Sequence, residues 1–467
     1  MKKTFSILIV LFAVLTLFGA DKPKYVFLFI GDGMSTPQRM IADEFSRALG
    51  RGQLTINTLP VHATTRTCSA NSLVTDSAAA ATAIACGERT NNSRVGVSAD
   101  GSRKLVSLAE VARDRGKKIG IVTSVTINHA TPAGFYAHRK SRSEYYAIGL
   151  DLIASKFDYF GGGGVNKHND KTSPLYKGDI YDLAAKAGYK VIGTRKDLLA
   201  LKPGDGKVLA YGNKENILPY SIDRRDDSVA TLAEFTAKGI ELLQDGPNGF
   251  FMMVEGGAID FAGHSNDAAT NLHEVVAFDE AVRVAMKFAE KHPDETLIVV
   301  TGDHETGGMT MGFAGTGYAL YVDRLKNQTR SAANFTESVG KMKKANPKLK
   351  FDDVKDLLAK TFGFKFSGNI KQDPMVLTAK DVAELKAAFD AIPAFQSGKK
   401  PEAEFKKTVN AFGLTAKRII CAKAGVGWTS GAHTALPVLT TSQGPKSELF
   451  HGFINNTDIS IRMKTIF

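Results

Sequence analysis

The sequence of 467 residues has few cysteines and a single tryptophan. Its three cysteines, Cys68, Cys86 and Cys421, allow at most one disulfide, and a Cys68–Cys86 pair across the intervening segment is one possibility. An odd number of cysteines also suits free, buried thiols, which is the arrangement that we expect. No Cys-x-x-Cys spacing occurs, and this argues against a zinc site built from thiolates.

Long apolar runs are also missing, because no segment after the N-terminus approaches the ~20 residues of a membrane-spanning helix. Residues 1–3 supply a positive start, 5–18 form a short apolar run, and Gly19 and Ala20 precede Asp21. This pattern predicts a signal peptide over residues 1–20, although Phe18 stands where a small residue is usual. We therefore expect secretion across the inner membrane to the periplasm or the medium, with no stable membrane anchor.

No block of basic residues is interleaved with aromatic ones, although the net charge is +12. The 60 lysines and arginines are spread along the chain, which fits a general attraction for small anions better than recognition of a nucleic-acid groove. We expect no nucleic-acid partner. The apolar fraction of 43% is ordinary for a globular protein with a sizeable core.

Continuous apolar runs alternate with helical patterns along most of the chain. Such runs are typical of strands buried on both faces, and they cover residues 25–30, 119–123, 249–254 and 296–300. Helices are expected near 105–115, 143–155, 228–243 and 268–291, a short strand near Tyr159, and helix, strand and helix over 180–225. The alternation predicts an α/β fold with a large, mostly parallel central sheet and helices on both faces.

Residues 327–416 differ in character, because they are rich in lysine and have helical patterns but no buried-strand run. Helical pieces are expected at 351–362, 379–391 and 402–412, and a strand around 418–422. We interpret 327–416 as a helical insertion in one α/β domain that covers residues 21–467.

Acidic residues and histidines follow several of the predicted strands. Ligands of parallel sheets bind beyond the carboxyl ends of the strands, where Asp32, the cluster from Glu255 to His264, and the pair Asp303-His304 are placed. Nitrogen and oxygen ligands of this kind suit zinc. Asp260 and His264 could share one ion and Asp303 and His304 a second, and two ions ~3.5–4 Å apart can assist an in-line displacement.

Ser77 follows Asp76 and leads into an alanine-rich run with high helix propensity. Its hydroxyl is therefore expected near a helix N-terminus, where an anion is favoured. Considered without the rest of the chain, Ser77 could simply be the N-cap. Beside a bound cation, however, its hydroxyl would ionise more readily and become a competent nucleophile.

Six motifs in order resemble those of the alkaline phosphatase family, the metal-dependent phosphomonoesterases. They span nearly the whole mature chain: Gly-Asp-Gly at 31–33, Thr-Asp-Ser-Ala at 75–78, His-Ala-Thr-Pro-Ala at 129–133, Glu-Gly-x-x-Ile-Asp at 255–260, Thr-Gly-Asp-His-Glu-Thr-Gly-Gly at 301–308, and Gly-x-His-Thr at 431–434. The resemblance implies hydrolysis of small-molecule phosphate monoesters with broad specificity, and a homodimer.

The resemblance also implies a role for each matching residue. Ser77 would form a phosphoserine intermediate, and Arg142 would hold two phosphoryl oxygens. One Zn²⁺ would be bound by Asp260, His264 and His433, and a second Zn²⁺ by Asp32, Asp303 and His304. A third ion, Mg²⁺, would be bound by Asp32, Thr131 and Glu255.

Two positions depart from the best-studied bacterial pattern of the family. His129 stands in place of an aspartate and Phe261 in place of a lysine. A histidine near the third site could favour Zn²⁺ or Co²⁺ over Mg²⁺ there. Whether His129 is itself a ligand stays open.

Three alternative functions would use part of the same set of residues. A phosphodiesterase or a sulfatase-type enzyme of the same superfamily would use a similar metal site with another substrate. A non-catalytic exported protein that binds metal or phosphate would need the ligands but not Ser77. An intact Ser77 and Arg142 favour the monoesterase.

Overall fold

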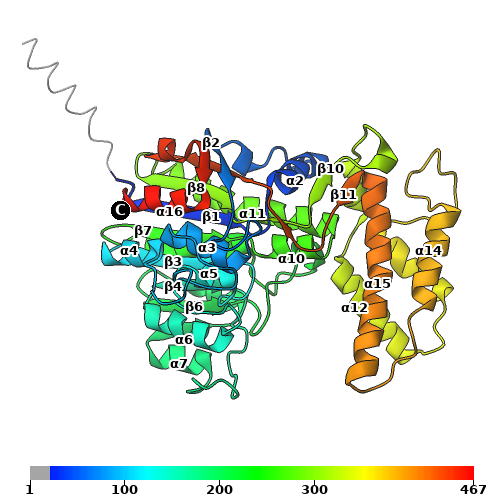
Figure 1. Ribbon diagram of the computed structural model, residues 1–467, viewed down its shortest axis with the longest axis horizontal. Helices are drawn as coiled ribbons and strands as arrows, with labels where there is room; N and C mark the ends of the chain where they lie inside the picture. Colours follow the sequence, from blue (N-terminus) through cyan, green and yellow to red (C-terminus); the bar gives the residue numbers. More distant parts are fainter. Residues whose placement is uncertain (1–21) are drawn as a thin grey trace, which may run out of the picture.

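The computed structural model describes residues 22–467, so the predicted signal peptide lies outside the described residues. A ten-stranded sheet forms the centre of the molecule, with the strand order β14-β2-β13-β8-β1-β7-β3-β4-β6-β5 (Figure 1). Its strands are β1 (Tyr25–Gly31), β2 (Val61–Arg66), β3 (Lys118–Thr123), β4 (Tyr159–Gly162), β5 (Tyr189–Ile192), β6 (Lys207–Tyr211), β7 (Phe250–Glu255), β8 (Thr296–Gly302), β13 (Val438–Gln443) and β14 (Gly452–Asn455). Only β13 runs antiparallel to its neighbours, β2 and β8. The predicted α/β fold with a mostly parallel sheet is confirmed.

The central strands are aligned so that they end together. In β1, Ile30 pairs with Glu255 of β7 and Gly31 pairs with Gly302 of β8, while Thr123 of β3 also pairs with Glu255. All three apolar strands β1, β7 and β8 are buried along their whole length. The residues that follow these strands therefore meet at one edge of the sheet.

Helices cover both faces of the sheet because successive residues of a strand point to opposite sides. In β1, Phe27 and Phe29 belong to one apolar core, whereas Val26 and Leu28 belong to the other. The first core includes residues of α2 (Thr36–Ala48), α9 (Leu232–Leu243) and α11 (Ala268–Ala289). The second includes residues of α3 (Ser77–Cys86), α4 (Leu108–Asp114), α5 (Ala130–Ala133), α6 (Tyr145–Ser155), α7 (Ile180–Lys186) and α16 (Asn456–Lys464).

The insertion is helical, as its composition predicted, and lies beyond α10 (Ala258–His264), at the right of Figure 1. It consists of α12 (Ala332–Ala345), α13 (Lys355–Phe362), α14 (Ala379–Asp390) and α15 (Lys399–Ala424). Its aromatic side chains, such as Phe335, Phe389 and Phe412, continue the first core. The insertion is therefore packed on the domain rather than tethered to it.

One of two further sequence-based expectations was wrong and the other is confirmed. The strand expected around 418–422 is the last part of α15, which continues until Gly425 at φ 83° ends it. The apolar residues Ile419 and Ile420 suggested a buried strand, but one buried helix face uses the same residues. The helix, strand and helix expected over 180–225 are α7, β5 and α8 (Arg195–Ala200); β6 and the 3₁₀ turn η2 (Ser221–Asp223) follow them.

Short strands and turns complete the carboxyl edge of the sheet. The strand β12 (His433–Thr434) pairs with β9 (Glu305–Thr306), so that His433 lies opposite Thr306. The strand β10 (Met309–Met311) pairs with β11 (Val426–Trp428). The remaining 3₁₀ turns are η1 (Thr55–Asn57), η3 (Ala314–Thr316), η4 (Val322–Asn327), η5 (Phe351–Val354) and η6 (Ser447–Phe450).

All three cysteines are free and buried, as expected. Within residues 22–467, no helix combines the length and the apolar character that a bilayer-spanning segment needs.

Candidate active site and metal centre

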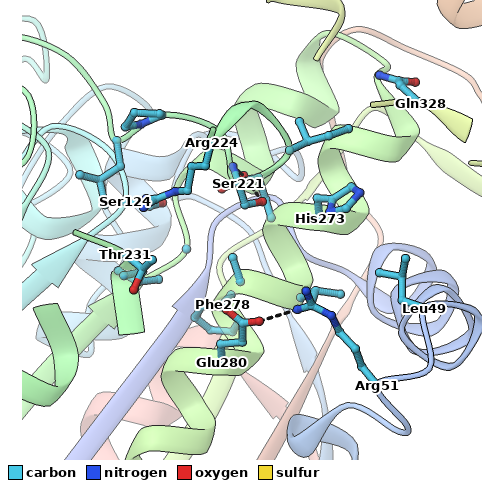
Figure 2. A pocket seen from close by; sticks show the side chains of 18 of the residues that line it. Leu49, Arg51, Ser124, Ser221, Arg224, Thr231, His273, Phe278, Glu280 and Gln328 are labelled. Atoms are coloured by element: carbon cyan, nitrogen blue, oxygen red, sulfur yellow. Dashed lines mark hydrogen bonds and ion pairs between the residues drawn. The ribbon is translucent and has the colours of Figure 1, made fainter. Parts of the chain in front are cut away.

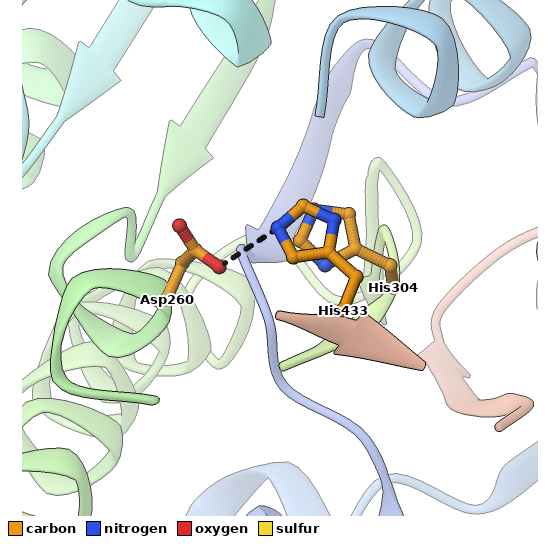
Figure 3. Close-up of side chains that lie close together, drawn as sticks. All are labelled: Asp260, His304 and His433. Carbon is orange, nitrogen blue, oxygen red and sulfur yellow. Dashed lines mark ion pairs between the residues drawn. The ribbon is translucent and has the colours of Figure 1, made fainter. Parts of the chain in front are cut away.

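Acidic residues and histidines from five segments converge at the carboxyl edge of the sheet. They form three overlapping groups, within each of which the possible ligand atoms lie within 4.8 Å of one another. The groups are Asp260, His304 and His433; Asp32, Asp303 and His304; and Asp32, His129 and Glu255. Figure 3 shows the first group, in which the imidazole of His433 stacks on that of His304 and pairs with Asp260.

Asp260 and His264 lie one turn apart on α10, and the pairing of β12 with β9 brings His433 to them. The Nε2 atoms of His264 and His433 are 3.1 Å apart. The His264 Nε2 is 3.4 Å from Asp260 Oδ2, and the His433 Nε2 is 3.5 Å from Asp260 Oδ1. Each Nδ1 lies 2.8 Å from a backbone carbonyl, that of Gly431 for His264 and that of Thr75 for His433. Such bonds fix the rings with Nε2 directed at a shared point, as in metal sites.

Asp32 and Asp303 follow the adjacent strands β1 and β8, and His304 lies beside both. The His304 Nε2 is 3.2 Å from Asp32 Oδ1 and 3.4 Å from Asp303 Oδ2. Gly33, whose φ of 74° suits glycine, donates its N–H to Asp303 Oδ1 at 3.1 Å. All three side chains are fully buried.

Ser77 is the first residue of α3, and the N-cap is Asp76, which accepts a hydrogen bond from the Ala79 N–H at 3.0 Å. The capping role therefore belongs to Asp76 and leaves the Ser77 hydroxyl available. Its Oγ lies 3.2 Å from His304 Nε2, although 227 residues separate the two in sequence. The structure thus places this hydroxyl beside the Asp32–Asp303–His304 group and at a helix N-terminus that favours an anion.

A third group surrounds Asp32 on its other side. Asp32, His129 and Glu255 form it, and the Thr131 hydroxyl donates to Asp32 Oδ2 at 3.3 Å. Thr123 donates to Glu255. The sequence left open whether His129 is a ligand, and the structure places its ring within reach of the same point as the two carboxylates.

Arg142 lies at the entrance to this group. Its Nη1 donates to Asp76 Oδ2 at 3.1 Å, and its Nη2 lies 3.1 Å from His129 Nε2. The nearby Arg139 is instead held by Asp151 through two hydrogen bonds of 2.6 and 2.7 Å. Of these two arginines, only Arg142 contacts the candidate site through its side chain.

The carboxylates at this edge fit divalent cations. Burial and the neighbouring carboxylates raise the pKa of Asp32, and burial together with neighbouring charge raises the pKa of Asp303 and Glu255. Among the described residues, several buried atoms of the site have no hydrogen-bond partner: Asp32 Oδ1, Asp303 Oδ2, Glu255 Oε1 and His129 Nδ1. Buried groups of this kind are normally paired or bound to metal. The donor set of imidazoles and carboxylates suits zinc, and the carboxylate and hydroxyl oxygens suit magnesium.

The pKa values of His304 and His433, which share a group with Asp260, shift in opposite directions. Burial and the charge of His433 lower the pKa of His304, which favours its neutral form, so its 3.2 Å approach to Asp32 Oδ1 is not an ion pair. Burial opposes charge on His433, but the hydrogen bond to Asp260 outweighs it and raises the His433 pKa. Burial would raise the pKa of Asp260, yet its bond to His433 and the surrounding imidazoles lower it. These contacts favour the ionised form of Asp260.

Sequence reasoning did not single out Thr306. Its hydroxyl donates to Asp260 Oδ1 at 2.5 Å and lies 3.2 Å from His304 Nδ1, so it orients one side chain from each of two groups. The signal was present, because Thr306 belongs to the motif at 301–308. Only the register of β9 and β12 shows what it touches.

A separate cavity of about 460 Å³ adjoins Gly256, the residue after β7 (Figure 2). It is lined by Ser124 and Gly256 at the sheet edge and by His273 and Glu280 of α11, where Arg51 pairs with Glu280. None of the residues in the three groups lines this cavity. The acid and histidine cluster is therefore a distinct site.

Comparison with known proteins agrees with this geometry. A family model described as alkaline phosphatase matches residues 23–467. Alkaline phosphatase 3 of Bacillus subtilis is 32% identical over 450 residues, which cover 94% of this chain and 88% of that protein. The cold-active alkaline phosphatase of a psychrophilic Shewanella species superposes with a TM-score of 0.79 at 30% identity, covering 95% of this chain and 99% of that one.

A third relative is a solved structure that is described with bound Mg. The TAB5 alkaline phosphatase of an Antarctic bacterium, in a histidine-to-glutamate variant described with Mg bound in the M3 site, superposes with a TM-score of 0.64 at 25% identity, covering 96% of this chain and 98% of that one. The family model over residues 23–467, the shared fold and the clustered candidate metal ligands lead to one conclusion. The chain belongs to the alkaline phosphatase family of metal-dependent phosphomonoesterases.

Proposed function

We propose that the protein is an exported alkaline phosphatase that transfers the phosphoryl group of a monoester to Ser77 and then to water. The observation that supports this most is the position of the Ser77 Oγ, 3.2 Å from His304 Nε2 at the first turn of α3. A serine that served only the helix would occupy the capping position, which Asp76 holds. The hydroxyl is instead directed into the cluster of candidate metal ligands.

The donor groups suggest how three ions would be distributed. Asp260, His264 and His433 would hold one Zn²⁺; Asp32, Asp303 and His304 would hold the second; and Asp32, Thr131 and Glu255 would hold Mg²⁺. When bound, these cations would neutralise phosphoryl charge and lower the pKa of the Ser77 hydroxyl.

The protein's own groups prepare the reaction. The α3 N-terminus stabilises an anion on Ser77, and Arg142 has N–H groups to donate to two phosphoryl oxygens. Asp76 holds the Arg142 guanidinium through Nη1, and its other oxygen caps α3. One carboxylate thus couples the position of the nucleophile's helix to that of the arginine.

The third ion depends on His129. Its ring lies with Asp32 and Glu255, so the group offers a nitrogen ligand as well as oxygens. Nitrogen ligands favour Zn²⁺ or Co²⁺ over Mg²⁺. In the TAB5 enzyme, Mg is described in the M3 site of a variant that has lost a histidine, which is consistent with this preference.

The test is hydrolysis of p-nitrophenyl phosphate by the zinc- and magnesium-loaded protein and by its Ser77→Ala variant. We expect the variant to lose at least about 10³-fold in kcat/KM while it keeps its metal content and thermal unfolding midpoint. Full activity in Ser77→Ala would exclude the phosphoserine.

The alternative functions can be distinguished by which substrate the protein hydrolyses fastest. A phosphodiesterase would hydrolyse bis(p-nitrophenyl) phosphate faster than the monoester, and a sulfatase would prefer p-nitrophenyl sulfate. The position of Arg142, which has two N–H-bearing ends directed at the site, favours the doubly charged monoester. A non-catalytic binding protein would show no turnover of any of the three.

Export and dimerisation are part of the same proposal. The positive start, the apolar run and the small residues before Asp21 support cleavage of residues 1–20 and export to the periplasm or the medium. The resemblance to the family supports a homodimer. Mass determination of the mature protein would test the cleavage of residues 1–20, and sedimentation analysis would test the homodimer.

A further inference from the structure

A cavity of about 530 Å³ lies beside His264, between the core and the helical insertion. His264 ends α10, and its side chain is 41% exposed, in contrast to the buried Asp260. Residues 264–266 form one wall of the cavity, and α12 and α15 form the other. Ser77 does not line it. The cavity therefore adjoins the candidate centre at His264, and Ser77 is not part of its wall.

The insertion is fixed against the core at this point. Lys417 of α15, which is buried, donates from Nζ to the Ser265 carbonyl. Asp267, which caps α11, accepts from the Ala332 N–H at 2.7 Å and from Gln328 Nε2 at 2.8 Å. These buried contacts hold the two walls together, so the cavity is a defined part of the fold.

The lining is mostly apolar, and its basic side chains on the insertion are Lys407 and Lys417. Thr336, Lys407, Asn410 and Leu414 supply most of the insertion's side, together with Lys417. No acidic side chain lines the cavity among the residues that the structure describes. The nearest acid to Lys407 is Glu404, with 4.0 Å between the charged atoms and side chains 79% and 59% exposed, so this pair does little to neutralise the lysine.

We propose that this cavity is the leaving-group subsite and that it favours monoesters whose alcohol has a negative charge of its own. The inference rests on the proposed function. As the Ser77 Oγ–P bond forms, the hydroxyl gives its proton to water; the bond between phosphorus and the ester oxygen breaks on the opposite side, and the alcohol oxygen keeps the electron pair and takes a proton from water. The proposal places that oxygen beside Asp260, His264 and His433, the group next to the cavity. Lys407 is then a specificity-determining residue.

The chain offers a matched control for this lysine. Lys406 is the preceding residue of α15, is also exposed, and lines a different groove with Lys341 and Phe405. Lys406→Glu and Lys407→Glu change the net charge equally and alter the same helix. A difference in substrate preference between the two variants therefore reflects the position of the lysine rather than the total charge of the protein.

The first measurement is kcat/KM for 4-carboxyphenyl phosphate divided by that for phenyl phosphate, at low ionic strength where exposed charges are least screened. Intrinsic reactivity cancels when the same ratio is compared between proteins. We expect Lys407→Glu to lower the ratio about fivefold and Lys406→Glu to change it less than about twofold. Equal ratios in all three proteins would overturn the subsite. Failure of the wild-type protein to hydrolyse either ester would overturn the proposed function instead.

The second measurement is binding, which does not depend on turnover. Calorimetry would compare 4-carboxybenzylphosphonate with benzylphosphonate, whose C–P bonds are not hydrolysed. We expect the carboxylate to strengthen binding about fivefold in the wild-type protein and in Lys406→Glu, but not in Lys407→Glu. Equal affinity of the wild-type protein for both compounds would contradict the proposal.

Discussion

Arg142 and Arg139 lie three residues apart, but their side chains have different partners. Arg142 bonds to Asp76 and His129 at the site, whereas Arg139 forms a two-point contact with Asp151 of α6. An arginine that binds phosphate contributes to substrate affinity. One that joins a loop to a helix contributes to the stability of the fold.

We therefore expect Arg142→Ala to lower kcat/KM for p-nitrophenyl phosphate about tenfold or more and to weaken inhibition by inorganic phosphate, because a charge-assisted contact to the phosphoryl group is lost. Arg139→Ala should instead lower the free energy of unfolding by about 1 kcal/mol or more and leave KM nearly unchanged. Steady-state kinetics and urea unfolding of both variants test this. The opposite pattern would show that Arg139 binds the substrate.

We expect His129 to influence which ion the third group prefers. Its Nδ1 has no partner, and its Nε2 is held by Arg142. His129→Asp would add a carboxylate to Asp32 and Glu255, and hard oxygen ligands suit Mg²⁺. We expect Mg²⁺ to bind at least about tenfold more tightly to the zinc-loaded variant, measured by calorimetry. His62→Asp, at an exposed position of β2, makes the same change of charge away from the site and should not alter Mg²⁺ affinity.

The helix α4 is fixed at its N-terminus by contacts that the sequence only partly shows. Ser107 and Glu110 form a capping box, a pattern that is visible in sequence. Glu110 also lies 3.2 Å from His138 Nε2, and His138 Nδ1 lies 2.8 Å from the Gly96 carbonyl. Burial lowers the His138 pKa, but these two bonds outweigh it and raise that pKa above its ordinary value.

This contact predicts a pH-dependent stability. A raised native pKa means that His138 stabilises the fold fully below the unfolded value of 6.5 and loses this effect as pH rises through the native pKa. We expect His138→Gln to lower the free energy of unfolding by about 1 kcal/mol at pH 6 and by less at pH 8, measured by urea unfolding. His62→Gln should show no such dependence. A loss in His138→Gln that grows with pH would contradict the assignment.

The elements that the sequence predicts well are those with one dominant signal. The strands β1, β7 and β8 are buried on both faces, so their apolar runs have no other explanation. The strands β2 and β13 have no such run, because exposed and hydroxyl side chains such as His62 and Thr440 interrupt them. Their pairing depends on contacts between residues about 375 positions apart, which a local pattern does not contain.

Prediction of the candidate site from sequence is limited in the same way, because local patterns do not contain long-range contacts. Asp32, Asp303 and His304 could be predicted because each follows a strand end, and the edge of a parallel sheet brings such positions together. The place of His129 in the third group and the contact of Thr306 with Asp260 depend on side-chain directions within loops. The end of α15 was misjudged for a related reason, since Ile419 and Ile420 suit a buried strand as well as a buried helix face.

At the scale of the whole molecule, the sheet carries a concentration of negative charge at one edge. Asp32, Glu255, Asp260 and Asp303 are all buried there, and Arg142 is the arginine that faces them. The raised pKa values of Asp32, Glu255 and Asp303 express this repulsion and the burial. Cations that bind only the folded chain would remove the repulsion and stabilise the fold by mass action.

Removal of metal should therefore destabilise the protein, and more so at higher pH. In the stripped protein, Asp303 and Glu255 keep their protons up to a pKa of about 7 and about 8, whereas the unfolded chain releases them near pH 4. Because the native state then binds more protons than the unfolded state, its stability falls as pH rises through this window. We expect a chelator to lower the thermal midpoint by several degrees at pH 6 and by more at pH 8, and Zn²⁺ with Mg²⁺ to restore it. Asp303→Asn should reduce the stabilisation by metal, whereas Asp205→Asn, away from the site, should not. If the midpoint were the same with and without chelator at both pH values, the carboxylates at this edge would not be the ligands of stabilising cations.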